Sequence, residues 1–255
     1  MDKRFTFNED VENYDKWRPT YCKELFNDII QYSELNQNKK AIEIGIGTGQ
    51  ATIPFLMTGC DVTAIELGSD LAEYSKEKFK KYTNFSIHNT SFEDFECNDN
   101  SFDILYSATA FQWIPEDIGY PKALNILKNG GTLALFWNKP FVKREDDLLH
   151  LKIQSIYEKY SPSNDKFIEN DTARYNKITK TIQSYGFRDV QVKLYHQTRT
   201  FNSSSYISLL DTYSDHRSME DSTKQLLYNE IENAILENGN ALNVYDTIDL
   251  YLARK

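Results

Sequence analysis

Short apolar runs alternate with segments of helical periodicity in the first half of the chain. The runs have strand length, and they lie at residues 41–46, 62–67, 85–88, 102–106 and 132–137. Segments with apolar residues three and four positions apart predict helices at 19–35, 48–58, 69–82 and 116–127. Ser69 is predicted to cap the helix at 69–82, and Asn129-Gly130-Gly131 is predicted to end the helix at 116–127. Strands separated by helices predict a doubly wound α/β fold, with a mostly parallel sheet covered on both faces.

The second half of the chain is less regular. Its patterns predict a helix around 146–160, a strand at 187–195, an amphipathic helix at 220–237 and a strand at 242–252. Since no internal repeat interrupts the sequence, we predict one domain over residues 1–255, with an inserted helical cap at 139–215.

Composition narrows the classes of function. The chain has 255 residues, of which 40% are hydrophobic, enough for a core without disulfides. Lys and Arg number 29 against 38 Asp and Glu, and a net charge of -9 opposes binding to nucleic acid or an anionic membrane. Three widely spaced cysteines predict reduced thiols and no metal site. With no signal-peptide pattern and no membrane-length apolar run, we expect a cytoplasmic protein.

A glycine-rich turn joins the first predicted strand to the next helix. Gly45, Gly47 and Gly49 permit a tight turn and leave the backbone open to a ligand. A dinucleotide-binding fingerprint would need a glycine at position 50, where this chain has Gln50. The spacing therefore disfavours a nicotinamide cofactor. A glycine-rich turn without any ligand remains an alternative from this motif alone.

Two acidic residues flank the turn in the sequence. Glu43 precedes it, where a carboxylate suits an ammonium or sulfonium group better than a pyrophosphate. Glu66 ends the second predicted strand, where a carboxylate can accept hydrogen bonds from both hydroxyls of a ribose. Together they indicate a nucleoside that carries a positively charged group.

These elements resemble the class I S-adenosylmethionine-dependent methyltransferases. The resemblance covers residues 10–140 and rests on Glu43–Gly49, Glu66 and Ser101–Leu105 in that order. It implies a Rossmann-like, seven-stranded sheet, a cofactor-binding core at 36–138, and S-adenosylmethionine as cofactor. In that family the glycine turn lies beside the methionine part, and the acid at Glu66, with Leu67 next to it, holds the ribose.

Two further segments acquire roles from the same resemblance. The stretch 90–95 is similar to the family's adenine-binding segment, although Ser91 replaces the usual acid and leaves the backbone N–H of Phe92 to serve. The backbone of Ser107 and Ala108 is expected near the methionine group. Gln112 and Trp113 are expected at the mouth of the active site.

Aromatic residues after the fourth strand have two interpretations. An aromatic face beside a sulfonium contributes roughly 0.5–2 kcal/mol, which favours Trp113 as a site-lining residue. Core packing is the alternative for Phe111 and Trp113.

Residues 14–21 are similar to the opening of a trans-aconitate methyltransferase-like subgroup, from which Cys22 departs because a proline is usual there. The resemblance suggests that Tyr14 and Arg18 close over the cofactor and hold its carboxylate, a group that suits the planar guanidinium. The alternative is an exposed arginine on a solvated segment.

The expected reaction is methyl transfer to a small-molecule acceptor, such as a carboxylate or a hydroxyl. His150, His196 and His216 are candidate bases, but no context selects one, so no catalytic residue is assigned. Two alternatives remain open: a protein that binds S-adenosylmethionine without catalysis, and an NAD-dependent oxidoreductase. We expect a monomer or homodimer, with neither nucleic acid nor membrane as partner.

Overall fold

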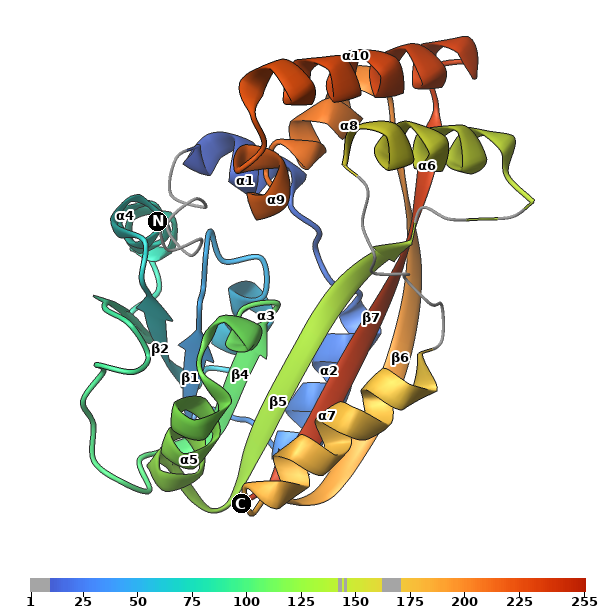
Figure 1. Ribbon diagram of the computed structural model, residues 1–255. Helices are drawn as coiled ribbons and strands as arrows, with labels where there is room; N and C mark the ends of the chain where they lie inside the picture. Colours follow the sequence, from blue (N-terminus) through green and yellow to red (C-terminus); the bar gives the residue numbers. More distant parts are fainter. Residues whose placement is uncertain (1–9, 142–143, 145, 162–170) are drawn as a thin grey trace.

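The computed structural model describes residues 10–141, 144, 146–161 and 171–255. One seven-stranded sheet runs through it in the order β3-β2-β1-β4-β5-β7-β6 (Figure 1). All pairs from β3 to β5 are parallel, and β7 is antiparallel to both of its neighbours. The strands are β1 Lys40–Ile44, β2 Asp61–Glu66, β3 Phe85–Asn89, β4 Phe102–Ala108, β5 Leu127–Phe141, β6 Arg188–Phe201 and β7 Leu242–Arg254. The predicted doubly wound, mostly parallel sheet is confirmed.

Helices cover both faces of the sheet, and each face has its own apolar core. On one face α2 (Lys23–Ser33), α3 (Thr52–Leu56) and α4 (Ser69–Phe79) pack against β1, β2 and β4. On the other face lie α5 (Glu116–Ile126) and α7 (Thr172–Ser184). The sequence pattern explains this, since apolar side chains at helical spacing form the buried stripe of each helix.

Several boundaries differ from the sequence-based predictions by a few residues, and three of the differences have a specific local cause. The helix predicted at 48–58 is only α3, because Gly49 has a φ of +82°, which no helix accommodates. Ser69 does not cap α4: Gly68 holds the cap position, and the Ser69 hydroxyl donates to Asp70. α5 ends before Asn129-Gly130-Gly131, because β5 already begins at Leu127 and these residues form an irregularity in its pairing with β4.

A layer of helices lies beyond the carboxyl ends of the parallel strands, on the long extensions of β5, β6 and β7 (Figure 1). It has a third apolar core, which includes Ile153, Leu209, Ile231 and Val244. Its helices are α6 (Leu148–Tyr160), α8 (Ser203–Leu210), α9 (Ser214–Arg217) and α10 (Asp221–Glu237).

This helical layer and the predicted cap at 139–215 do not consist of the same helices and strands. It includes α10, which lies outside that range, whereas α7 and β6 lie inside the range but belong to the sheet and its cover. Positions 142–143, 145 and 162–170 of the range are outside the described residues.

A short helix that the sequence reading did not predict, α1 (Val11–Trp17), bridges the sheet layer and the helical layer. The amide of Asn13 donates to the backbone of Ser208 in α8, and Asp15 pairs with Lys78 of α4 at 2.7 Å. No residue of α1 is buried, so these contacts with the helical layer and with α4 fix its position. Among the described residues, no helix combines the length and apolar character needed to cross a membrane.

Candidate active site

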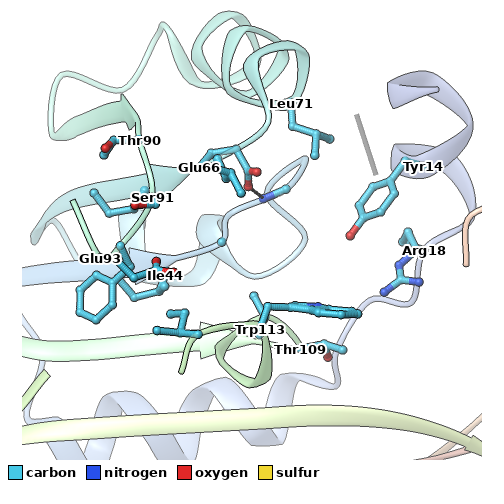
Figure 2. Close-up of a pocket in the computed structure, with 18 residues that line it drawn as sticks. Tyr14, Arg18, Ile44, Glu66, Leu71, Thr90, Ser91, Glu93, Thr109 and Trp113 are labelled. Atoms are coloured by element: carbon cyan, nitrogen blue, oxygen red, sulfur yellow. Dashed lines mark hydrogen bonds between the residues drawn. The ribbon is translucent and has the colours of Figure 1, made fainter. Parts of the chain in front are cut away.

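A pocket lies at the carboxyl ends of β1, β2, β3 and β4, beside α1. It holds about 730 Å³, which is within the range of small-molecule sites. Figure 2 shows Tyr14 and Arg18 on one side of the pocket and Thr90 and Ser91 on the opposite side. Parallel sheets place ligands at this edge because loops after adjacent strands converge there.

Ten of the fourteen residues predicted for the site line this pocket. They are Tyr14, Arg18, Gly45, Gly47, Glu66, Leu67, Ser91, Phe92, Ala108 and Trp113. The lining also includes residues that the sequence reading missed, namely Ile44, Ile65, Leu71, Thr90, Glu93, Thr109, Ala110 and Ile114. Several of these either end a strand or directly follow one, and that position is the signal that could have found them.

Glu66 connects the end of β2 to the glycine turn. One carboxylate oxygen accepts from the backbone N–H of Gly47 at 2.8 Å, drawn in Figure 2, and the other from Gly68 at 2.9 Å. Burial raises the pKa of Glu66, although the N–H groups of Gly68 and Gly47 oppose that shift. The side chain is 8% exposed, so its carboxylate is fixed by the backbone at the pocket wall.

The three glycines of the turn have different roles. Gly45 has a φ of +68°, and a Cβ there would lie 2.4 Å from the Cβ of Ala110. A Cβ on Gly47 would face the Tyr14 ring at 3.4 Å, across the pocket. Gly49 does not line the pocket: a Cβ there would lie 2.3 Å from the Phe79 ring of α4. Gly49 is therefore required by helix packing.

A smaller pocket of about 350 Å³ adjoins the larger one and shares Tyr14, Arg18 and Thr109 with it. Glu43 and Tyr21 line only this second pocket. The predicted site is thus divided in two: the larger pocket contains Glu66, and the smaller pocket contains Glu43.

Arg18 stands between two tyrosine rings, with its guanidinium carbon 5.1 Å from the centroids of both Tyr14 and Tyr213. Burial lowers the pKa of this guanidinium, but the neighbouring tyrosine oxygens outweigh burial and raise it overall. Within the described part of the chain no carboxylate forms an ion pair with Arg18. The guanidinium of Arg18 can therefore form an ion pair with an anionic group of a ligand.

Glu43 is buried beneath the glycine turn. The hydroxyls of Thr52 and Tyr106 donate to the same carboxylate oxygen, at 2.8 and 2.9 Å. Burial raises the pKa of Glu43 to about 8, because these two hydrogen bonds do not compensate for the lost hydration and Glu66 adds repulsion.

This pKa predicts a pH-dependent stability. Between the unfolded value of about 4.5 and the folded value of about 8, the folded state binds more protons, so stability is full at low pH and falls as pH rises through this window. We expect Glu43→Gln to flatten that decline and to melt above the parent at pH 9. Thermal melts from pH 5 to 9 would measure this. Equal slopes for parent and variant would contradict the raised pKa.

Two predicted residues lie beside the pockets rather than in their lining. The hydroxyl of Ser107 donates to the backbone of Ile44, inside the core. Gln112 is the middle residue of a short 3-10 helix, η2 (Phe111–Trp113), and its amide accepts from the Trp137 ring N–H and donates to the carbonyl of Thr109. Gln112 thereby holds the turn that places Trp113 at the pocket.

The histidines considered as bases lie outside both pockets. His150 and His216 are buried in the helical layer, and a ring nitrogen of His196 on β6 contacts Thr247. Phe111 is buried in the core, as the packing alternative predicted.

The part of the chain that matches a known family model lies mostly in its first half and includes the parallel strands. Residues 42–135 match the family model of a methyltransferase domain. An uncharacterized methyltransferase of Schizosaccharomyces pombe is 21% identical over 96% of this chain and 92% of its own length. An uncharacterized methyltransferase of Mycobacterium bovis is 25% identical, and the match spans only 54% of each chain.

Solved structures show the same fold. A phosphoethanolamine N-methyltransferase of Haemonchus contortus, in complex with S-adenosylhomocysteine, superposes with a TM-score of 0.60 at 14% identity, over 100% of this chain and 61% of that one. The match over residues 42–135 and the methyltransferase relatives indicate S-adenosylmethionine-dependent methyl transfer, and the solved structures share the fold of this class of enzyme.

Proposed function

We propose that the protein methylates a small-molecule acceptor and that the two adjoining pockets bind the two halves of S-adenosylmethionine. The observation that carries this proposal is the pairing of charges. The larger pocket has the backbone-anchored carboxylate of Glu66, whereas the smaller pocket has the carboxyl group of Glu43, and the guanidinium of Arg18 lines both. A nucleoside with an amino-acid tail requires this set, because the tail has both an ammonium and a carboxylate.

The nucleoside half fits the larger pocket. Glu66 is positioned for the ribose hydroxyls, and Leu67, Ser91 and Phe92 are available to the adenine. The tail then extends over Gly45 toward Arg18, and its ammonium approaches Glu43. An ammonium at this point favours the ionised form of Glu43, since opposite charges lower the pKa of a carboxyl group.

The sulfonium and its methyl group would lie at the junction of the pockets, near Trp113 and Tyr14. Transfer is an in-line displacement, in which the acceptor's lone pair forms a bond to the methyl carbon while the carbon–sulfur pair returns to sulfur. Alignment of the two reactants can supply much of the rate. The net charge of -9 supports a small acceptor over nucleic acid, and a carboxylate or hydroxyl acceptor remains our proposal.

Titration calorimetry with S-adenosylmethionine and with NAD tests the cofactor site. We expect binding of the first alone, and binding of NAD alone would reverse the proposal. Turnover over a panel of carboxylates, phenols and amines then distinguishes an enzyme from a protein that binds the cofactor without transfer, since only the enzyme releases S-adenosylhomocysteine.

Arg18→Ala tests the tail-binding half of the site. We expect about tenfold weaker binding of S-adenosylhomocysteine, the loss of one charge-assisted contact. Calorimetry would measure it, with Arg188→Ala as the control because Arg188 is exposed on β6. Affinity equal to that of the parent would remove Arg18 from the site.

A further inference from the structure

Tyr21 and Thr109 form a hydroxyl pair on the wall of the smaller pocket. Their oxygens are 3.0 Å apart, and both residues line that pocket together with Arg18 and Glu43. Tyr21 lies in the segment after α1, whereas Thr109 directly follows β4. The pair therefore joins that segment to the carboxyl edge of the sheet.

Thr109 has an unusual backbone. Its φ is +57°, a left-handed conformation that is strained for a β-branched residue. The surrounding structure maintains it: the Thr109 N–H donates to Phe136 at 2.8 Å, and the Thr109 carbonyl accepts from Gln112 at 3.1 Å. Strain of this kind persists only where the surrounding structure holds it, and in this conformation the Thr109 hydroxyl contacts Tyr21.

The hydrogens of this pair can be counted. Thr109 Oγ1 accepts the backbone N–H of Asn138 at 3.2 Å and shares one hydrogen bond with the Tyr21 hydroxyl. Two hydroxyls have two hydrogens, and their mutual bond uses one. Within the described residues no acceptor is found for the other hydrogen. One hydroxyl donor is therefore left over on the wall of the smaller pocket.

Cooperativity along the hydrogen bonds favours Tyr21 as that donor. Either oxygen can donate in the bond between them, and donation from Thr109 to Tyr21 continues the series that starts at the N–H of Asn138, in which each hydrogen bond strengthens the next. Burial raises the pKa of Tyr21 to about 12, so its phenol keeps its hydrogen and acts as a donor, not as a base.

Packing fixes the position of this donor. The Tyr21 ring lies edge-on to Phe136, with centroids 4.9 Å apart. The amide of Gln197 on β6 donates to the carbonyl of Thr20 at 2.8 Å, which ties the neighbouring residue to the sheet. The hydroxyl therefore occupies one place in the pocket before any ligand arrives, which reduces the entropic cost of binding.

We propose that Tyr21 is a second donor to the carboxylate that Arg18 binds, and that Thr109 is a positioning residue that directs the Tyr21 hydroxyl toward it. This rests on the proposed function, in which the smaller pocket takes the amino-acid tail. A planar cation and a neutral hydroxyl from one short segment, residues 18–21, would then share one anion.

The experiment compares two ligands that differ in the tail alone. S-adenosylhomocysteine has the α-amino and α-carboxyl groups, whereas 5′-methylthioadenosine has the same nucleoside and sulfur but lacks both. We expect Tyr21→Phe, which keeps the packed ring, to weaken S-adenosylhomocysteine binding about tenfold and to leave 5′-methylthioadenosine binding unchanged. Thr109→Ala should show the same selectivity with a smaller loss, and Thr109→Ser should restore most of it.

The outcomes separate this inference from the proposed function. If the parent binds neither ligand, the proposed cofactor site itself fails. If the parent binds both and Tyr21→Phe binds S-adenosylhomocysteine equally well, the Tyr21 donor is refuted while the site remains. Equal losses for both ligands would assign Tyr21 and Thr109 to the shape of the pocket, which also overturns the proposal.

Discussion

Glu66→Ala is expected to weaken S-adenosylmethionine binding by about ten- to a hundredfold, or roughly 1.5–3 kcal/mol. The carboxylate is positioned by two backbone N–H groups, from Gly47 and Gly68, at 2.8 and 2.9 Å. Alanine removes the acceptor proposed for the ribose and also frees the N–H of Gly47 in the glycine turn. Because the second loss loosens the turn, we expect a value toward the upper end, measured by calorimetry.

Glu77→Ala provides the matched control. It makes the same change of charge on α4, where Glu77 is 68% exposed and pairs with Lys80 at the surface. We expect parental affinity for this variant. The assignment of Glu66 to the site would be wrong if both variants bound the cofactor as the parent does.

Gly49→Ala is expected to lower the free energy of unfolding by roughly 2–5 kcal/mol. The left-handed backbone, with a φ of +82°, costs any residue with a Cβ about 1–2 kcal/mol. The new Cβ would also lie 2.3 Å from the Phe79 ring, and overpacking of this kind costs about 1–3 kcal/mol. Urea unfolding would measure the change.

Gly239→Ala isolates the backbone contribution. Its φ of +77° is similar, but nothing lies within 4 Å of the added Cβ. We expect Gly239→Ala to lose only the stability that the left-handed backbone costs, without the cost of overpacking. If Gly49→Ala lost no more stability than Gly239→Ala, the contact with Phe79 would not be what requires a glycine in the turn.

Alternation of apolar runs with helical periodicity was sufficient to predict the sheet and most of its covering helices. Errors occurred where a single backbone angle or pairing decides the outcome. The helix predicted from residue 48 begins at Thr52 because Gly49 is left-handed, and Leu127 pairs with Phe102 before the glycines that follow it. α1 has no buried face, so no apolar periodicity could reveal it.

The candidate site was predicted in outline because ligand pockets of parallel sheets lie where strands end. Side-chain direction was the missing information. Glu43 and Glu66 both lie at the glycine turn, yet they line different pockets, since the Glu43 side chain points into the core beneath the turn. Thr109 and Tyr21 were missed because they are 88 residues apart in the sequence and meet only through the fold.

The helical layer packs around its own apolar core, which has no buried residue in common with the two cores of the sheet. It rests on strand extensions beyond residue 135, where the match to the family model ends. Replacing its interior as a set, for instance Ile153, Leu209 and Ile231, would change this layer without altering the residues that line the larger pocket. If the proposed function holds, we expect such replacements to change acceptor preference and to leave cofactor binding intact.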